Sequence, residues 1–112
     1  MGDGLLRGLL SMAIQLVNWR AAHFRDGSWF RGENRETFLY TERNGRQLYV
    51  EAPFEAIGTV DRVILFRSIK QWEPPYQHDA LPSEKREEIL EKLACYFGRI
   101  CVSYIVDRDW PA

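Results

Sequence analysis

Two short runs rich in β-branched and aromatic residues flank the dipeptide Asn44-Gly45, and this pattern is the strongest local constraint on the fold. Residues 37–41 and 47–50 have the composition of strands, and Asn-Gly is the preferred centre of a two-residue type I′ hairpin turn. The pattern therefore predicts an antiparallel hairpin in which Thr41 lies opposite Leu48. One face of this hairpin would carry Leu39, Thr41, Leu48 and Val50, and the other would carry Phe38, Tyr40 and Tyr49.

Hydrophobic periodicity predicts two helices and two further strands around the hairpin. Asp3 can cap a helix over residues 4–23, because its apolar residues recur at i, i+4, i+7 and i+8, and a glycine-containing loop follows over 25–35. The continuous apolar run 63–66 predicts a buried central strand. Ser83 is expected to cap a helix over 84–97 that Gly98 ends, and residues 100–106 form a last apolar strand.

These elements predict an α+β fold made of an N-terminal helix and an antiparallel-rich sheet of about four strands, with the second helix between strands 3 and 4. A length of 112 residues suits one domain. Within it, residues 1–35 would form the N-terminal helix and loop, and residues 36–107 the α+β core. The direction of the last strand is left open.

Composition narrows the class of protein. Apolar residues make up 46 % of the chain, and the net charge is −1. The chain therefore lacks the excess of positive charge that is typical of nucleic-acid-binding proteins. The apolar segment Leu5–Val17 has an acidic start and is too short to span a bilayer, so we expect neither a signal peptide nor a membrane anchor. Its apolar face would pack on the sheet or against a second copy. Cys95 and Cys101 match no metal or redox spacing and are expected as buried free thiols in a reducing cytoplasm.

The segment Ile69-Lys70-Gln71-Trp72-Glu73-Pro74-Pro75-Tyr76 is the most unusual part of the chain. Two consecutive prolines restrict φ and remove two backbone donors, so the segment is stiff and holds its aromatic residues at set positions. Stiff aromatic loops often form recognition surfaces. Trp72 can therefore be a contact residue, or its ring can close the core beneath the sheet.

Catalytic and metal-binding patterns are weak. His23 suits the end of a helix, and His78 stands beside Asp79, where it could act as a general base, but no nucleophile lies near it in sequence. Glu73 and Asp79 could form an acid pair, and with His78 they could offer three metal ligands, yet the spacing matches no known motif. We therefore expect no enzymatic activity, no metal and no cofactor.

The order of these features resembles a family of small bacterial immunity proteins of polymorphic-toxin systems. The resemblance covers residues 36–107: a hairpin with an Asn-Gly turn, an apolar strand, the Trp72–Tyr76 turn, the helix that begins at Leu81-Pro82-Ser83, and a closing strand that ends in Tyr104-Ile105-Val106. The thirty or so residues before the hairpin depart from the pattern. The resemblance implies a cytoplasmic protein, similar to those of contact-dependent inhibition, that binds and neutralises the toxin encoded beside it.

Acidic residues concentrate between positions 73 and 91, where they would complement a basic toxin surface such as the active site of a nuclease. The alternative for these acids is an ordinary solvated helix face that the helix dipole favours. A homodimeric adaptor, joined through the N-terminal helix, is the second functional hypothesis. The residues expected to contact the partner are Trp72, Glu73, Tyr76, His78, Asp79, Glu84, Glu87, Glu88 and Glu91.

Overall fold

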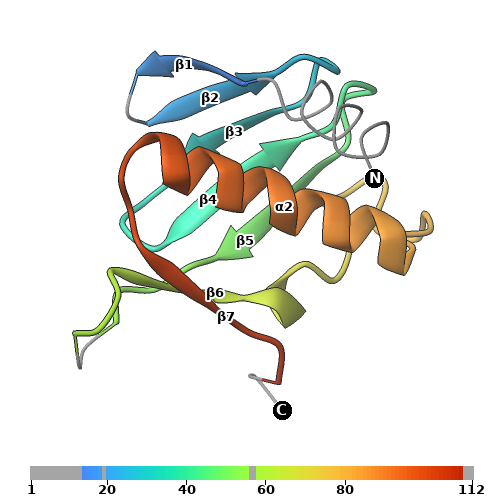
Figure 1. Cartoon of the computed structure of the whole chain (residues 1–112). Coiled ribbons are helices and arrows are strands. Elements are labelled where there is room, and N and C mark those ends of the chain that lie inside the picture. Colours follow the sequence, from blue (N-terminus) through green and yellow to red (C-terminus); the bar gives the residue numbers. More distant parts are fainter. Residues whose placement is uncertain (1–13, 19, 56–57, 110–112) are drawn as a thin grey trace, which may run out of the picture.

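The fold is an antiparallel sheet of five strands with one long helix across a face and a parallel pair of strands beside it (Figure 1). The structure is a computed structural model that describes residues 14–18, 20–55 and 58–109. The large sheet has the sequential order β1 (Ile14–Asn18), β2 (Ala21–Phe24), β3 (Trp29–Gly32), β4 (Thr37–Thr41) and β5 (Gln47–Glu51). After it come β6 (Arg62–Leu65), the short 3-10 helix η1 (Phe66–Ser68), α2 (Ser83–Arg99) and β7 (Tyr104–Asp107).

The prediction of a helix reaching residue 23 is wrong, because the described part of that segment forms the hairpin β1–β2. Ile14 pairs with Phe24 and Leu16 with Ala22 in an antiparallel register. This pairing places Ala22 and Phe24 in the core while His23 between them is exposed, so the period of two prevails over the helical spacing. Residues 1–13 lie outside the described residues. From Ile14 to Phe24 the described residues form strands. The predicted dimer interface therefore has no helical face in this part of the chain.

The predicted fold class is also wrong in its strand count and in the position of the second helix. The described residues contain seven strands, and α2 lies between the sixth and the seventh. The loop predicted over 25–35 contains β3, whose Phe30 pairs with Tyr40 and is fully buried. Gly27, with a φ of 92°, turns the chain tightly between β2 and β3, so this glycine marks a hairpin and not a long loop.

The hairpin β4–β5 forms at the predicted residues with a register shifted by one. Tyr40 pairs with Leu48, and Thr41 pairs with Gln47. The turn is longer than predicted, because the Gly45 amide donates to the Glu42 carbonyl and Gly45 has a φ of 94°. This is the geometry of a three-residue loop with a glycine bulge. A shift of one residue exchanges the faces, so Phe38, Tyr40, Leu48 and Val50 point into the core.

The core lies between the large sheet and α2, and aromatic rings dominate it. Phe38 packs edge-on against Phe97 of α2 with 5.2 Å between ring centroids, and Phe30 lies 5.1 Å from Tyr40. The buried residues of α2 are Ile89, Leu90, Lys92, Leu93, Tyr96 and Phe97. Burial of this apolar stripe fixes the helix across the sheet, as Figure 1 shows.

The parallel pair β6–β7 stands beside β5, so the run 63–66 is not the central strand that its composition predicts. Ile64 pairs with Val106, and α2 provides the crossover that a parallel pair requires. Between β6 and α2 the chain runs along the free edge of β5. There the Glu51 amide donates to Ser68 Oγ at 2.9 Å, and the Glu73 amide donates to the Gln47 carbonyl at 2.7 Å. This path places residues 69–80, called the Pro-Pro segment below, next to the large sheet.

The ends of α2 differ from the prediction. Ser83 is the first helical residue, and the capping position is Pro82, which makes no side-chain cap. Gly98 lies inside the helix, and Cys101 follows it with a φ of 58°. The Cys101 amide donates a hydrogen bond to the Gly98 carbonyl, and the Val102 amide donates one to the Phe97 carbonyl. These two bonds end the helix in a Schellman motif. Neither Cys95 nor Cys101 forms a disulfide, but Cys101 is exposed and Cys95 half-buried, so the prediction of two buried thiols is wrong.

The substitution Cys101→Gly is expected to raise the free energy of unfolding by about 1 kcal/mol, because the left-handed conformation at this position strains every residue with a Cβ atom. Urea denaturation followed by tryptophan fluorescence measures the change. Cys101→Ser keeps the strain and is the matched control. Equal stability of the Gly and Ser variants would contradict the prediction.

Candidate functional site

Trp72 belongs to the core, which resolves the alternative that its sequence left open. Its side chain is only 3 % exposed, and its indole Nε1 donates to the Ala80 carbonyl at 3.2 Å. This bond ties the beginning of the Pro-Pro segment to its end. The Trp72 ring therefore stabilises the loop from beneath and is not on its outer surface.

Two side chains of the Pro-Pro segment, Tyr76 and Asp79, contact Arg46 of the β4–β5 turn. The Pro74-Pro75 peptide bond is cis, and Tyr76 follows it. The Arg46 guanidinium lies 4.5 Å from the centroid of the Tyr76 ring and donates to Asp79 Oδ2 from Nε at 2.9 Å and from Nη2 at 2.6 Å. Arg46 thus neutralises Asp79 and covers part of Tyr76. Neither group is available as an uncommitted contact.

Glu73 and His78 also belong to the Pro-Pro segment, but the fold does not place them beside a nucleophile. Glu73 is half-buried and His78 is exposed, and neither side chain makes an ion pair or a hydrogen bond with the described residues. No group of three His, Cys, Asp or Glu side chains within the described ranges could hold a metal ion. The acid pair considered for Glu73 and Asp79 is not formed, because Asp79 is paired with Arg46.

Two of the four α2 acids are committed to basic residues. Glu87 accepts two hydrogen bonds from Arg108, at 2.6 and 3.0 Å, and these bonds lower the pKa of Glu87. Burial alone would raise the pKa of Glu88, but hydrogen bonds and charge from Lys85 and Lys92 lower it further than burial raises it. Glu84 and Glu91 are exposed and make no ion pair with the described residues.

A buried lysine network lies between α2 and the sheet, and the sequence reasoning missed it. The Lys92 side chain is 1 % exposed, and its ammonium contacts Asp26 at 2.5 Å, Ser28 Oγ at 2.8 Å and Glu88 at 3.3 Å. Tyr40 Oη lies 3.3 Å from the same ammonium and donates to Glu42. Burial is the main reason why the pKa of Tyr40 is raised, with the Glu42 contact adding to it. A lysine on the buried stripe of α2 was the signal that could have found this network.

Ser28 and Lys92 are close enough for a nucleophile and its base, but their surroundings argue for a structural role. Ser28 is 1 % exposed, and its hydroxyl donates to Asp26 at 2.6 Å. Lys92 forms ion pairs with two carboxylates. A substrate has no path to Ser28 Oγ in this arrangement, and the serine and lysine donors are already used.

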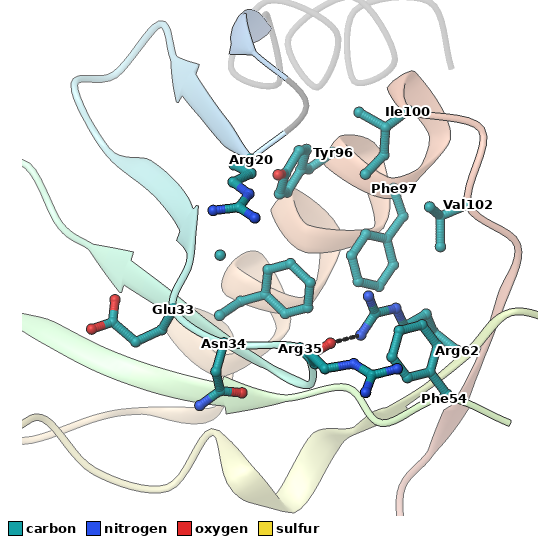
Figure 2. Close-up of a pocket in the computed structure, with 12 residues that line it drawn as sticks. Arg20, Glu33, Asn34, Arg35, Phe54, Arg62, Tyr96, Phe97, Ile100 and Val102 are labelled. Atoms are coloured by element: carbon teal, nitrogen blue, oxygen red, sulfur yellow. Dashed lines mark hydrogen bonds between the residues drawn. The ribbon is translucent and has the colours of Figure 1, made fainter.

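A pocket of about 490 Å³ opens between the sheet and the C-terminal end of α2. Its apolar wall combines rings of the sheet and the helix with residues beyond the helix, and Figure 2 shows three arginines around it. The apolar residues are Phe38, Phe54, Tyr96, Phe97, Ile100 and Val102. The polar residues are Arg20, Glu33, Asn34, Arg35 and Arg62. None of them belongs to the predicted contact set.

Arg62 is the most enclosed of the three arginines. Its Nη1 donates to the Arg35 carbonyl at 2.5 Å and to the Ala52 carbonyl at 3.0 Å, and its Cζ lies 3.9 Å from the centroid of the Phe54 ring. Burial lowers the pKa of Arg62, while the charges of Glu36 and Asp61 act in the opposite direction. Figure 2 shows Arg20 on the opposite side of the pocket from Arg62.

The chain matches no protein-family model, no curated protein and no solved structure. Among the described residues, no helix is both long enough and apolar enough to cross a bilayer.

Proposed function

We propose that this protein is a non-enzymatic, cytoplasmic immunity protein that binds a cognate toxin domain and blocks it. The sequence resemblance over residues 36–107 motivates the class. The contact surface is the outward face of α2, and the partner surface is basic, as in the active site of a nuclease.

The observation that carries the proposal is the pair of uncommitted carboxylates on this face. Glu84 and Glu91 are both exposed and make no ion pair with the described residues. They stand seven residues apart, so both project from one side of the helix about 10 Å apart. Buried residues on the opposite side hold α2 on the sheet, so this pair is displayed on a rigid element.

Glu87 lies between them on the same face and is shared with Arg108. This ion pair is exposed, so it contributes little to stability and can open at little cost when a cationic partner arrives. Glu88 is turned toward Lys85 and Lys92 and contributes to the fold instead. The proposed contacts are therefore Glu84, Glu87 and Glu91, with Glu73 and His78 at the margin.

Growth rescue tests the class of protein. The toxic C-terminal domain encoded beside this gene is expressed with and without this chain, and cell growth is followed. Specific rescue by this chain, but not by an unrelated immunity protein, supports the proposal. Growth arrest that persists although both proteins are expressed and folded contradicts it.

The double substitution Glu84→Lys and Glu91→Lys is expected to weaken toxin binding at least tenfold, or about 1.4 kcal/mol, because it reverses both charges that face the basic partner. Isothermal titration calorimetry at two salt concentrations measures the affinity. The double substitution Glu33→Lys and Glu36→Lys, with the same change of net charge, is the matched control, since both acids are exposed and lie in the β3–β4 connection. Equal affinity of the two double variants would remove the α2 face from the proposal.

A further inference from the structure

The pocket near the C-terminal end of α2 has a floor that suits a flat ring. Phe38 lies 5.2 Å from Phe97 and 6.1 Å from Tyr96, and Tyr96 lies 6.0 Å from Phe97, all between ring centroids. Ile100 and Val102 continue this apolar wall. A volume of about 490 Å³ is within the range of sites for small organic ligands.

Two arginines place positive charge at the rim of the pocket. Arg35 and Arg62 both lie against the ring of Phe54, with Cζ-to-centroid distances of 5.6 and 3.9 Å. Neither forms an ion pair with a carboxylate of the described residues, and the hydrogen bonds of Arg62 leave from Nη1 only. The one carboxylate of the lining, Glu33, pairs with Arg31 at 3.2 Å.

Two guanidinium groups on one ring repel each other, and an anion placed between them would remove that repulsion. Planar guanidinium donors match carboxylate and phosphate oxygens in a two-pronged geometry. Phe54 and Phe38 partly shield the Arg62 guanidinium from water, which strengthens its attraction to an anion. The rim therefore selects negative charge while the floor selects an apolar ring.

We propose that this pocket binds a small organic anion composed of a planar aromatic ring and a carboxylate or phosphate group. The ring lies against Phe38, Ile100 and Val102, and the anionic group lies between Arg35 and Arg62. Arg20, on the far side, closes the rim. This site is distant in the fold from the N-terminal half of α2, so it does not depend on the toxin-binding proposal.

Three related compounds separate the contributions of ring and charge. Calorimetric titrations of the full chain use 2-naphthyl phosphate, 2-naphthoate and the uncharged 2-naphthalenemethanol. We expect one-to-one binding of at least one anion, at least tenfold tighter than that of the alcohol and weaker at high salt. The tighter of the two anions identifies phosphate or carboxylate as the preferred group. Binding of the alcohol as tight as that of both anions, or no saturable binding of either anion, overturns the proposal.

Arg35→Gln provides the residue-specific test. The Arg35 side chain is exposed, and the Arg62 hydrogen bond goes to the Arg35 backbone carbonyl, so the substitution leaves that bond in place. We expect at least a fivefold loss of affinity for the preferred anion. Arg25→Gln, in the turn at the opposite end of the β2–β3 hairpin, is the control and should leave affinity unchanged. Equal losses in both variants would show attraction by net charge alone and overturn the assignment.

Amide chemical shifts locate the ligand independently of affinity. In a titration with the preferred anion, the backbone amides of residues 32–35 and 100–102 are expected to move, since both segments line the pocket. Shifts confined to the Pro-Pro segment, or to the N-terminal half of α2, would place the ligand elsewhere and contradict the proposal.

Discussion

Replacing Lys92 by alanine is expected to lower the free energy of unfolding by about 2–5 kcal/mol, the range for truncating a large buried side chain to alanine. The ammonium is the shared donor for Asp26, Ser28 and Glu88, and it is 1 % exposed. Its loss removes these three contacts and the contact to Tyr40 Oη, and it leaves a cavity beside Tyr40. Urea denaturation followed by tryptophan fluorescence measures the effect.

Lys92→Met separates the charge from the packing of the side chain. Methionine fills most of the volume of the lysine stem, and the Asp26 and Glu88 side chains are each 41 % exposed, so water can solvate their carboxylates. The loss of stability should therefore be smaller than for alanine. If Lys92→Ala unfolds with nearly wild-type stability, the network contributes little to the fold and the prediction is wrong.

Acid titration gives a second measurement of the same network. The pKa of Asp26 is lowered because hydrogen bonds from Lys92 and Ser28 outweigh the opposing effect of burial, and the pKa of Glu88 is lowered for the same kind of reason. A lowered folded-state pKa contributes stability above the unfolded value of about 4, and this contribution is lost as the pH falls through the folded-state value. The stability of wild type should therefore fall more steeply below pH 4 than that of Lys92→Met.

The sequence located the β4–β5 hairpin but not its register. The residues of both strands were predicted correctly, because their composition is local information. The pairing of Tyr40 with Leu48 depends on whether Asn44-Gly45 forms a two-residue turn or ends a three-residue loop. The two turns differ by one residue, and this difference exchanges the buried and exposed faces. Burial against α2 decides it, and that contact is not local.

The N-terminal prediction failed for a related reason. The segment 14–24 can be drawn as an amphipathic helix or as two short strands, and its apolar residues satisfy both periods. Pairing of Phe30 with Ala22, through β3, provides hydrogen bonds and burial that a helix in this place would lack. Tertiary context thus prevails over local periodicity. By contrast, α2 was predicted over nearly its full length, because its apolar stripe at helical spacing is the face that packs on the sheet.

The candidate sites divide in the same way. The acids of the Pro-Pro segment and of α2 were visible in the sequence, but their partners Arg46 and Arg108 are distant in the chain. The arginine-rimmed pocket draws on five separate segments, and its three arginines have no common motif. Local sequence can therefore indicate where charged residues accumulate, but the fold decides which charges remain uncompensated.

Trp72→Ala is expected to lower the free energy of unfolding by about 3–5 kcal/mol, as for other large rings removed from a core. Trp72→Phe, which keeps an apolar ring but loses the bond to the Ala80 carbonyl, should cost far less. Thermal unfolding by circular dichroism compares the two.

These variants also decide how the Pro-Pro segment acts in recognition. A buried Trp72 shapes the loop, so its removal should weaken toxin binding only together with loss of the fold. Tyr76→Ala removes an exposed ring and should leave stability nearly unchanged. If Trp72→Ala retained wild-type stability and yet lost toxin binding, Trp72 would be a contact residue, and the assignment of its ring to the core would be wrong.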